Sequence, residues 1–354
     1  MASVVISGDT SGAITLSAPA VAGTTTLTLP ATSGTVLQSG TTVTEAQGGT
    51  GTTTGYYGFK NRIINGAMVI DQRNAGAAQT ITGGASPLAF NCDRWQVRSA
   101  GSNATVQQVA TNNTYRMVFT GLASNSAVAA SQSIEALNCV DMAGQNVTLS
   151  LVAKSTSLTS LTLEAYYANT TNTFGTWGSP TVTSIGTQAV TISTTESTVS
   201  WTFAVPSAAT TGIQIRITGG ALLASQTLTI GNVQLEKGST ATSFDYRPYG
   251  TELALCQRYY STAGAIRTVG ASSSTAGVIL EISIPVTLRG TPSFSGSVSQ
   301  IRAYNATSIS IASATYSVSG TYDNSVYIQV GSLSVTDNTV YWATLNSSSL
   351  SAEL

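Results

Sequence analysis

Two short stretches decide the fold class of this chain: VTLSLVA at Val147–Ala153 and LTLEAYY at Leu161–Tyr167. In both, apolar residues alternate with residues that are mostly Thr, Ser or Glu. Successive side chains of a strand point to opposite faces, so a period of two predicts antiparallel strands that are covered on one face. The same pattern recurs at Trp201–Val205, Ile213–Ile217 and Leu228–Ile230. About eight to ten such strands between residues 56 and 250 predict a jelly roll or β-sandwich.

The composition favours an all-β chain and excludes several classes of partner. Only 8% of the residues are charged, against about 25% in ordinary globular proteins. Ser and Thr, which suit strands and turns better than helix interiors, supply much of the polar surface instead. The net charge of −1 creates no basic field. We therefore expect neither a nucleic acid partner nor insertion into a membrane.

The N-terminus and the cysteines predict where the protein is made. Met1–Gly8 lacks the basic flank and the long apolar stretch of a signal peptide. No apolar run approaches the ~20 residues that are needed to span a bilayer. We therefore expect the chain to be synthesised and folded in a cytoplasm. Cys92, Cys139 and Cys256 are far apart and form no CxxC pair, which predicts buried, reduced thiols.

Residues 1–55 form the first of three predicted parts of the chain. They contain no aromatic residue and predict short strands at Ala13–Pro19, Thr24–Pro30 and Thr35–Leu37. Strands this short cannot bury their apolar faces within one chain, so we expect identical copies to supply the neighbours. Gln47–Gly55 is rich in glycine but lacks the Lys of a phosphate-binding loop, which favours a linker.

The second predicted part is the jelly roll of residues 56–250, and the third is a distal β domain of residues 251–354. The clearest strand patterns of the distal domain lie at Val278–Ile284, Tyr304–Ile311, Val326–Val330 and Val340–Trp342. Between the two domains, Thr251–Tyr260 can begin as a helical turn, whereas Arg258–Tyr260 favours a strand.

Several segments, taken in their order along the chain, resemble those of a known protein family. The amino-terminal ones are Thr24–Pro30, Ser33–Leu37 and Gln47–Thr53; the ones flanking the jelly roll are Asn61–Met68, Ile70–Asn74, Cys92–Trp95, Asn232–Glu236, Tyr246–Gly250 and Leu253–Tyr260. Together these segments contain 54 of the 354 residues. On these segments the chain resembles the receptor-binding tail fibres of bacteriophages, and beyond about residue 265 it resembles no family that we recognise.

The resemblance implies a homotrimeric fibre in the virion. Its N-terminus would dock to other phage tail or baseplate proteins, and synthesis would take place in the cytoplasm of the host bacterium. The resemblance also implies that the central jelly roll is similar to carbohydrate-binding domains. The distal end would then meet the bacterial surface.

Catalysis and metal binding are not expected from the residues present. The chain has no His, so a Ser–His nucleophile is impossible. Asp71, Asp93 and Glu135 are the only carboxylates near the motif that opens the jelly roll, and Asp93 beside Arg94 predicts a structural ion pair. Jelly rolls of this kind often hold a structural calcium ion, to which Asp71 or Glu236 could contribute, but no Asp-rich loop is visible. We expect no enzyme activity, no metal and no cofactor.

Contact with carbohydrate is the remaining candidate, because aromatic rings stack on sugar faces while amides and hydroxyls bond to sugar hydroxyls. Tyr166, Asn169 and Trp177 combine these groups in a loop-like setting. Alternation places Tyr166 and Tyr167 on opposite faces, so one of them should fill the core. For Trp177, the alternative to sugar contact is packing within the loop. The candidates in the distal domain are Tyr304, Tyr322, Asn324 and Trp342.

The sequence therefore predicts a tail fibre protein that adsorbs the phage to bacterial lipopolysaccharide or capsule. The alternatives are a structural fibre segment or capsid decoration without a ligand, and a secreted carbohydrate-binding protein. Because the distal domain lacks the shared motifs but keeps many aromatic residues, it is the expected binding part. A chain that ends near Gly250 should then fold without competing for host cells.

Overall fold

The computed structural model describes residues 3–7, 11–17, 59–84, 89–123, 125–264, 267–274, 277–303, 308–309, 314–322, 325–333, 335, 339–346 and 348–354. Of these residues, 54% lie in strands and 6% in helices, which confirms the all-β prediction. The chain divides into two compact units, residues 1–55 and 56–354. Within the described ranges, no helix is long and apolar enough to cross a membrane.

The first unit contains an antiparallel hairpin of β1 (Ser3–Ser7) and β2 (Ala13–Ser17), in which Val5 lies opposite Thr15. Strand β2 confirms the first of the predicted short strands. The other two, at Thr24–Pro30 and Thr35–Leu37, and the glycine-rich segment Gln47–Gly55 lie outside the described residues.

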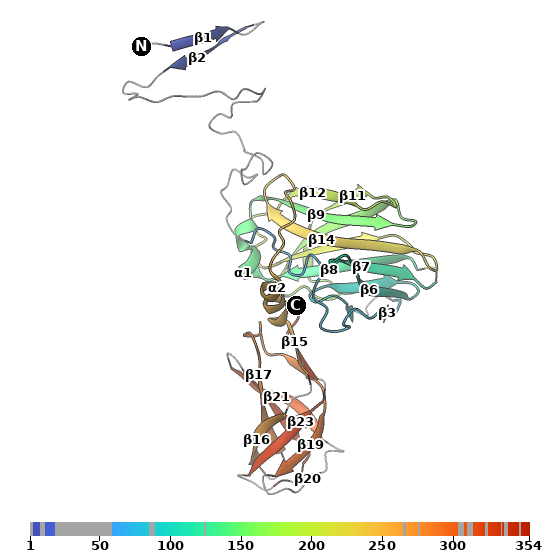
Figure 1. The fold of residues 1–354 in the computed structure, drawn as a ribbon, viewed down its shortest axis with the longest axis vertical. Coiled ribbons are helices and arrows are strands. Elements are labelled where there is room, and N and C mark those ends of the chain that lie inside the picture. The colour runs from blue at the N-terminus through green and yellow to red at the C-terminus, as the bar shows by residue number, and fades with distance from the viewer. Residues whose placement is uncertain are drawn as a thin grey trace. The chain divides into compact units, whose positions relative to one another are not determined.

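The second unit begins with a sandwich of two six-stranded antiparallel sheets (Figure 1). The first sheet has the order β11-β10-β13-β8-β5-β4, with bounds Val182–Thr191, Ser160–Ala168, Ile213–Gly219, Ala127–Ile134, Gln96–Ala100 and Ala89–Phe90. The second has the order β12-β9-β14-β7-β6-β3, with bounds Ser197–Ala204, Asn146–Ser155, Thr227–Lys237, Thr114–Gly121, Ala104–Thr111 and Gln79–Ile81. Strand β9 pairs with β14 and β10 with β13, so the chain wraps between the sheets as a jelly roll.

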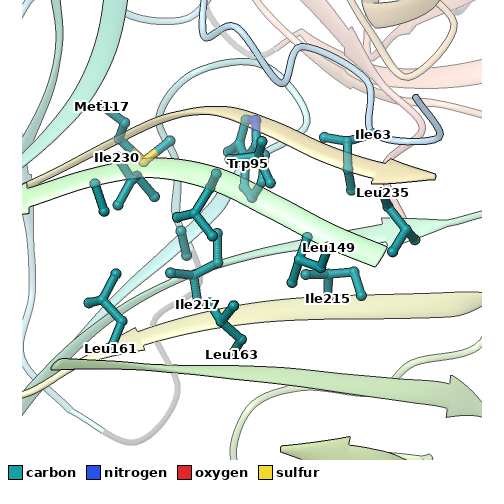
Figure 2. Packing of buried hydrophobic residues seen from close by; sticks show 14 of the residues in the cluster. Ile63, Trp95, Met117, Leu149, Leu161, Leu163, Ile215, Ile217, Ile230 and Leu235 are labelled. Atoms are coloured by element: carbon teal, nitrogen blue, oxygen red, sulfur yellow. The ribbon is translucent and has the colours of Figure 1, made fainter. Parts of the chain in front are cut away.

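Alternation along the strands builds the core between these sheets. Leu149 of β9 and Leu161 and Leu163 of β10 are buried, as are Ile215 and Ile217 of β13 (Figure 2). Tyr167 packs against the same core while Tyr166 faces the other way, as the alternation predicted. Burying apolar surface at ~25 cal/mol per Å² is the main force that holds the two sheets together.

The described part of the jelly roll has twelve strands, more than the eight to ten predicted. Strand β8 was missed because nearly all of its residues, on both faces, are buried, so its sequence AVAASQSI carries no period of two. Strands β3 and β4 are only three and two residues long, too short for any pattern. A single-turn helix α1 (Ala136–Cys139) and a 3₁₀ turn (Val140–Met142) follow β8. Cys92, Cys139 and Cys256 are free and buried, as expected.

The distal domain contains a seven-stranded and a three-stranded sheet with a separate core. The larger sheet has the order β20-β19-β23-β16-β17-β22-β21, with bounds Ser308–Ile309, Val298–Ala303, Val340–Leu345, Arg267–Ser274, Gly277–Ser283, Ser325–Gly331 and Thr315–Tyr322. The smaller has the order β15-β24-β18, with bounds Tyr260–Gly264, Ser348–Ser351 and Ser293–Ser295. Strands β17, β22 and β23 confirm three of the predicted patterns. Of the fourth, Tyr304–Ile311, only β20 is described.

Helix α2 (Tyr249–Gln257) links the jelly roll to the distal domain. The prediction of a strand at Arg258–Tyr260 was wrong for its first two residues. Arg258 has right-handed helical dihedral angles and donates its backbone N–H to Ala254 O, so it continues the helix. Strand β15 begins only at Tyr260.

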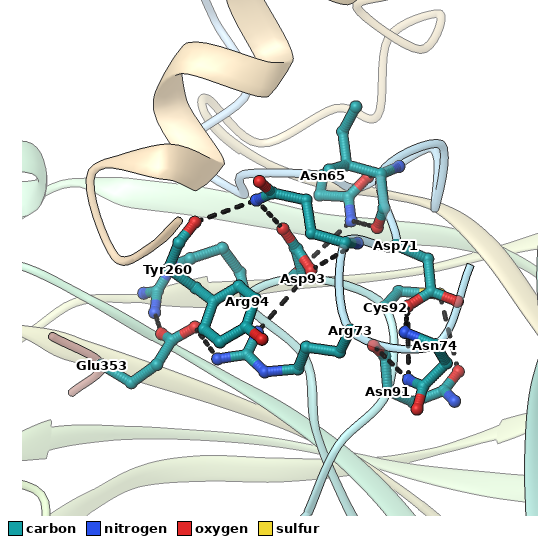
Figure 3. A network of polar contacts seen from close by, with 12 residues as sticks. Asn65, Asp71, Arg73, Asn74, Asn91, Cys92, Asp93, Arg94, Tyr260 and Glu353 are labelled. Atoms are coloured by element: carbon teal, nitrogen blue, oxygen red, sulfur yellow. Dashed lines mark hydrogen bonds and ion pairs between the residues drawn. The ribbon is translucent and has the colours of Figure 1, made fainter. Parts of the chain in front are cut away.

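The motif residues of the jelly roll form a buried polar joint with the distal domain (Figure 3). Asp93, which has no exposed surface, accepts hydrogen bonds from the backbone and the side chain of Gln72 and lies 3.6 Å from Arg73 Nη1. Arg73 pairs with Glu353 at 3.1 Å and stacks on the Tyr260 ring at 3.6 Å. The joint therefore connects the turns that precede β3 and β5 of the jelly roll with both ends of the distal domain.

Arg94 makes the second half of this joint. It pairs with Glu353, donates to Ser133 O at 2.6 Å, and lies 3.5 Å above the Tyr259 ring. Asp93 and Arg94 are therefore structural, as predicted, but they do not pair with each other. Adjacent residues at a turn point in different directions, so each of the two finds a partner elsewhere.

Candidate functional site

The outer face of the first six-stranded sheet carries the side chains that alternation leaves out of the core. Pairing places Glu164 of β10 beside Arg216 of β13, and Arg216 beside Ser131 of β8. In the neighbouring row, Tyr166 lies beside Gln214. The core sits on the opposite side of these strands, so this row of polar and aromatic groups belongs to one continuous surface.

Arg216 is the centre of this surface. Its guanidinium carbon lies 4.4 Å from the centroid of the Tyr166 ring and 4.5 Å from that of the Trp177 ring. Its Nε donates a hydrogen bond of 2.7 Å to Gln214 Oε1. Only 8% of Arg216 is exposed, whereas both rings are partly exposed. We call Tyr166, Trp177 and Arg216 the aromatic–arginine cluster.

Glu164 borders this cluster and is held in place by two hydroxyl groups. Tyr166 Oη donates to Glu164 Oε1 at 3.0 Å, and Thr218 Oγ1 donates to Glu164 Oε2 at 3.0 Å. Burial, followed by the charge of Glu164, raises the pKa of the Tyr166 hydroxyl, so that it remains a neutral donor. The outer face thus combines a carboxylate, two hydroxyl groups and two partly exposed aromatic rings, whereas the amide of Gln214 is buried and bonded to Arg216 and Ser133.

The loop between β10 and β11 presents Trp177. Asn169 donates its backbone N–H to Thr181 O at 2.9 Å, and Thr181 donates its own to Phe174 O at 3.1 Å. The Phe174 ring is buried beneath the loop. Asn172 Oδ1 accepts a hydrogen bond of 2.8 Å from the Ala136 backbone N–H. These contacts order the loop, so the indole is held in place rather than free in solvent.

Arg98 of β5 reaches the same indole from another part of the sheet. Its guanidinium carbon lies 5.4 Å from the Trp177 centroid, and its Nε donates to Gly84 O at 3.4 Å. Arg98 and Arg216 therefore meet at one aromatic ring from two strands that β8 separates.

The residues that were predicted to bind a ligand fall into two groups. Tyr166 and Trp177 come together through Arg216, and Asn169 lies exposed at the base of the same loop, where its side chain accepts a hydrogen bond from Thr183. The distal group does not gather in the described structure. Tyr304 and Asn324 lie outside the described residues, and so does the side chain of Tyr322 at the end of β21. As ligand contacts, all of these remain predictions.

Trp342 is the distal candidate that the structure describes fully, and 49% of it is exposed. It pairs with Val269 across β23 and β16. Beside them, a shallow depression of about 330 Å³ is lined by residues that include Ala271, Ile279, Tyr327 and Val340. This surface is largely aliphatic, so it offers fewer hydrogen-bonding groups to a sugar than the aromatic–arginine cluster does.

Sequence reasoning missed Arg216, Arg98, Gln214 and Glu164. A signal for three of them was present. Gln214 and Arg216 occupy the polar positions of the alternating run Ile213–Ile217, and Glu164 occupies one in β10. Such positions face away from the core, but the pattern does not say which strands will be neighbours.

The acidic residues considered for calcium already have protein partners. The Asp71 carboxylate accepts hydrogen bonds from the backbone N–H groups of Asn74 and Gly76, at 2.9 and 2.8 Å. Glu236 accepts from the backbone and the hydroxyl of Thr242, at 2.9 and 2.6 Å. Among the residues that the structure describes, no three His, Cys, Asp or Glu side chains gather as metal ligands would.

No protein-family model and no curated protein sequence matches the chain. Solved structures resemble about half of it. The enzymatically active domain of bacteriophage CBA120 tailspike protein 4 is 16% identical with a TM-score of 0.34, over 51% of this chain and 22% of that chain. A CBM4 structure is 16% identical with a TM-score of 0.31, over 49% of this chain and 98% of its own. TmCBM61, solved in complex with β-1,4-galactotriose, is 13% identical with a TM-score of 0.32, over 50% of this chain and 99% of its own. Likeness at this level assigns neither a ligand nor an activity to this chain.

Proposed function

We propose that this chain is the tail fibre protein of a bacteriophage and that it adsorbs the virion to a bacterial surface glycan without cleaving it. The order of the sequence motifs supports the tail fibre assignment and the homotrimer that goes with it. The observation that carries glycan binding is the aromatic–arginine cluster on the outer face of the first sheet.

The chemistry of the cluster suits a sugar. The partly exposed rings of Tyr166 and Trp177 offer flat apolar surfaces for the C–H face of a pyranose. Glu164, which borders them and is partly exposed, supplies a carboxylate that can orient sugar hydroxyls. The ordered loop around Trp177 lowers the entropy cost of binding, because the indole is already placed.

The state of the acids supports the proposal of binding without hydrolysis. Cleaving a glycosidic bond needs two carboxyl groups about 5–10 Å apart. On the described outer face of the first sheet, Glu164 is the acid within the cluster, and its two oxygens accept hydrogen bonds from Tyr166 and Thr218. Asp93, the most strongly perturbed carboxyl group, belongs to the interdomain joint instead.

The test is to measure binding of the full-length protein to an array of bacterial lipopolysaccharides and capsular polysaccharides. Trp177→Ala removes a stacking surface and should weaken binding to the best polysaccharide at least about tenfold, or ~1.4 kcal/mol. Chromatography of the polysaccharide after incubation should show an unchanged chain length. Circular dichroism of the variant should match that of the wild type, which separates loss of the site from loss of the fold.

Trp342→Ala is the matched control, because it removes an exposed indole from the distal sheet. It should bind as the wild type does. If Trp342→Ala loses binding and Trp177→Ala does not, the distal domain binds the glycan, as the sequence alone suggested. If the wild type binds no polysaccharide, a structural fibre segment is the better assignment.

A further inference from the structure

Arg216 differs from the other deeply buried arginines of the chain. The side chains of Arg94 and Arg247 are 2% and 4% exposed, and each pairs with a carboxylate, Glu353 and Glu252. Arg216 is also buried, with 8% of the whole residue exposed, yet within the described residues no carboxylate oxygen lies within 4.0 Å of its guanidinium group. A buried cation is costly unless it is paired, so Arg216 retains a capacity to bind an anion.

Arg98 increases this capacity. The two guanidinium groups converge on the Trp177 indole, and Arg98 also has no carboxylate within 4.0 Å among the described residues. Burial lowers the pKa of Arg216; Tyr166 and Glu164 oppose this shift, and the charge of Arg98 adds to it. Glu164 of β10 is the acid that strand pairing places opposite Arg216. It lies on the far side of β13 from Arg98. Two like charges close together make a local positive site on a chain whose net charge is −1.

We infer that Arg98 and Arg216 bind an anionic substituent, carboxylate or phosphate, of the glycan whose ring stacks beside them on Trp177. This inference rests on the proposed function and narrows its ligand to acidic polysaccharides. Guanidinium groups hold carboxylates and phosphates through strong charge-assisted hydrogen bonds, and contact with the Trp177 indole shields both guanidinium groups partly from water. Neutral polysaccharides would satisfy the aromatic rings but leave both arginines unpaired.

The experiment uses the full-length protein and the acidic polysaccharide that binds best on the array. Isothermal titration compares this polysaccharide with two matched derivatives of itself: one with its uronate carboxyl groups reduced to alcohols, and one with its phosphates removed by hydrofluoric acid. The derivative that lacks the recognised anion should bind at least about tenfold more weakly than the native polysaccharide does. Which derivative loses affinity identifies carboxylate or phosphate as the anion. Raising the salt concentration should weaken binding of the native polysaccharide and not that of the weaker derivative.

Arg98→Gln tests the protein side, because Arg98 is less buried than Arg216 and its loss spares the core. This variant should bind the native polysaccharide and the weaker derivative with equal affinity. Arg302→Gln, which removes an exposed arginine from the distal sheet, should keep the wild-type preference. If the wild type binds native and derivatised polysaccharides equally, the anion site is refuted while glycan binding stands. If it binds no polysaccharide at all, the proposed function fails, and the anion site fails with it.

Discussion

At the scale of the residue, Asp93 shows how burial and pairing compete. Its carboxyl group has no exposed surface and accepts hydrogen bonds from Gln72, with Arg73 3.6 Å away. Burial raises its pKa from 3.8 to about 6, although Gln72 and Arg73 oppose the shift. The folded protein therefore holds this proton to a higher pH than the unfolded chain does. The stability that Asp93 contributes is fully present below about pH 4 and is lost as the pH rises to about 6.

We therefore expect Asp93→Asn to change the pH dependence of folding. The free energy of unfolding of the wild type, minus that of the variant, should fall by about 2 kcal/mol between pH 4 and pH 7, since one pKa unit corresponds to about 1.4 kcal/mol and part of the effect is already lost at pH 4. Urea titrations of both proteins at several pH values would measure this difference, and other carboxyl groups cancel in the subtraction. A difference that is constant or that grows with pH would contradict the assignment.

At the scale of the element, helix α2 and the residues after β24 hold the jelly roll as well as the distal domain. Glu252 of α2 accepts a hydrogen bond from the backbone N–H of Asn65 and pairs with Arg247 at 3.1 Å. Glu353, beyond β24, pairs with Arg73 and Arg94. The end of the chain thus completes a polar network whose other half lies near the start of the jelly roll. Removing the residues after Gly250 would therefore break this network.

The sequence suggested that a chain ending near Gly250 folds independently. The joint predicts instead that such a chain is destabilised. Arg94 would lose both Glu353 and the Tyr259 ring, and removing one partner of a buried pair costs about 3–5 kcal/mol. Thermal unfolding followed by tryptophan fluorescence would show an earlier transition than that of the jelly roll in the full-length protein. Arg94→Met in the shortened chain should recover part of the loss, because it removes the unpaired charge. Equal transition temperatures for the shortened and full-length chains would show that the joint does not stabilise the jelly roll.

At the scale of the whole molecule, the first unit points to assembly. The described part of residues 1–55 is the hairpin of β1 and β2, and an isolated two-stranded hairpin is at best marginally stable in water. Further strands are needed, and identical chains supply them most simply. We therefore predict that light scattering of the full-length protein gives about three times 36.2 kDa, independent of concentration over the micromolar range. A folded monomer would refute the homotrimer.

Local patterns in the sequence determined the fold class and much of the strand layout. The alternation in Val147–Ala153 and Leu161–Tyr167 predicted β9 and β10, and it correctly separated Tyr166 from Tyr167. Alternation is a property of neighbouring residues, so the sequence alone is enough to detect it. It fails where a strand is buried on both faces, as in β8.

Only the tertiary structure decided which polar side chains meet. Trp177 comes from a loop, Arg216 and Arg98 from two different strands, and their shared position depends on the order β13-β8-β5. Likewise, adjacency does not predict the partners of Asp93 and Arg94, because Asp93 is bonded by Gln72 and Arg73, whereas Arg94 pairs with Glu353, more than 250 residues further along the chain. Strand order is set by packing of the whole core, which no local pattern encodes. The sequence could therefore propose Tyr166 and Trp177 as contacts, but only the sheet places two cations beside them.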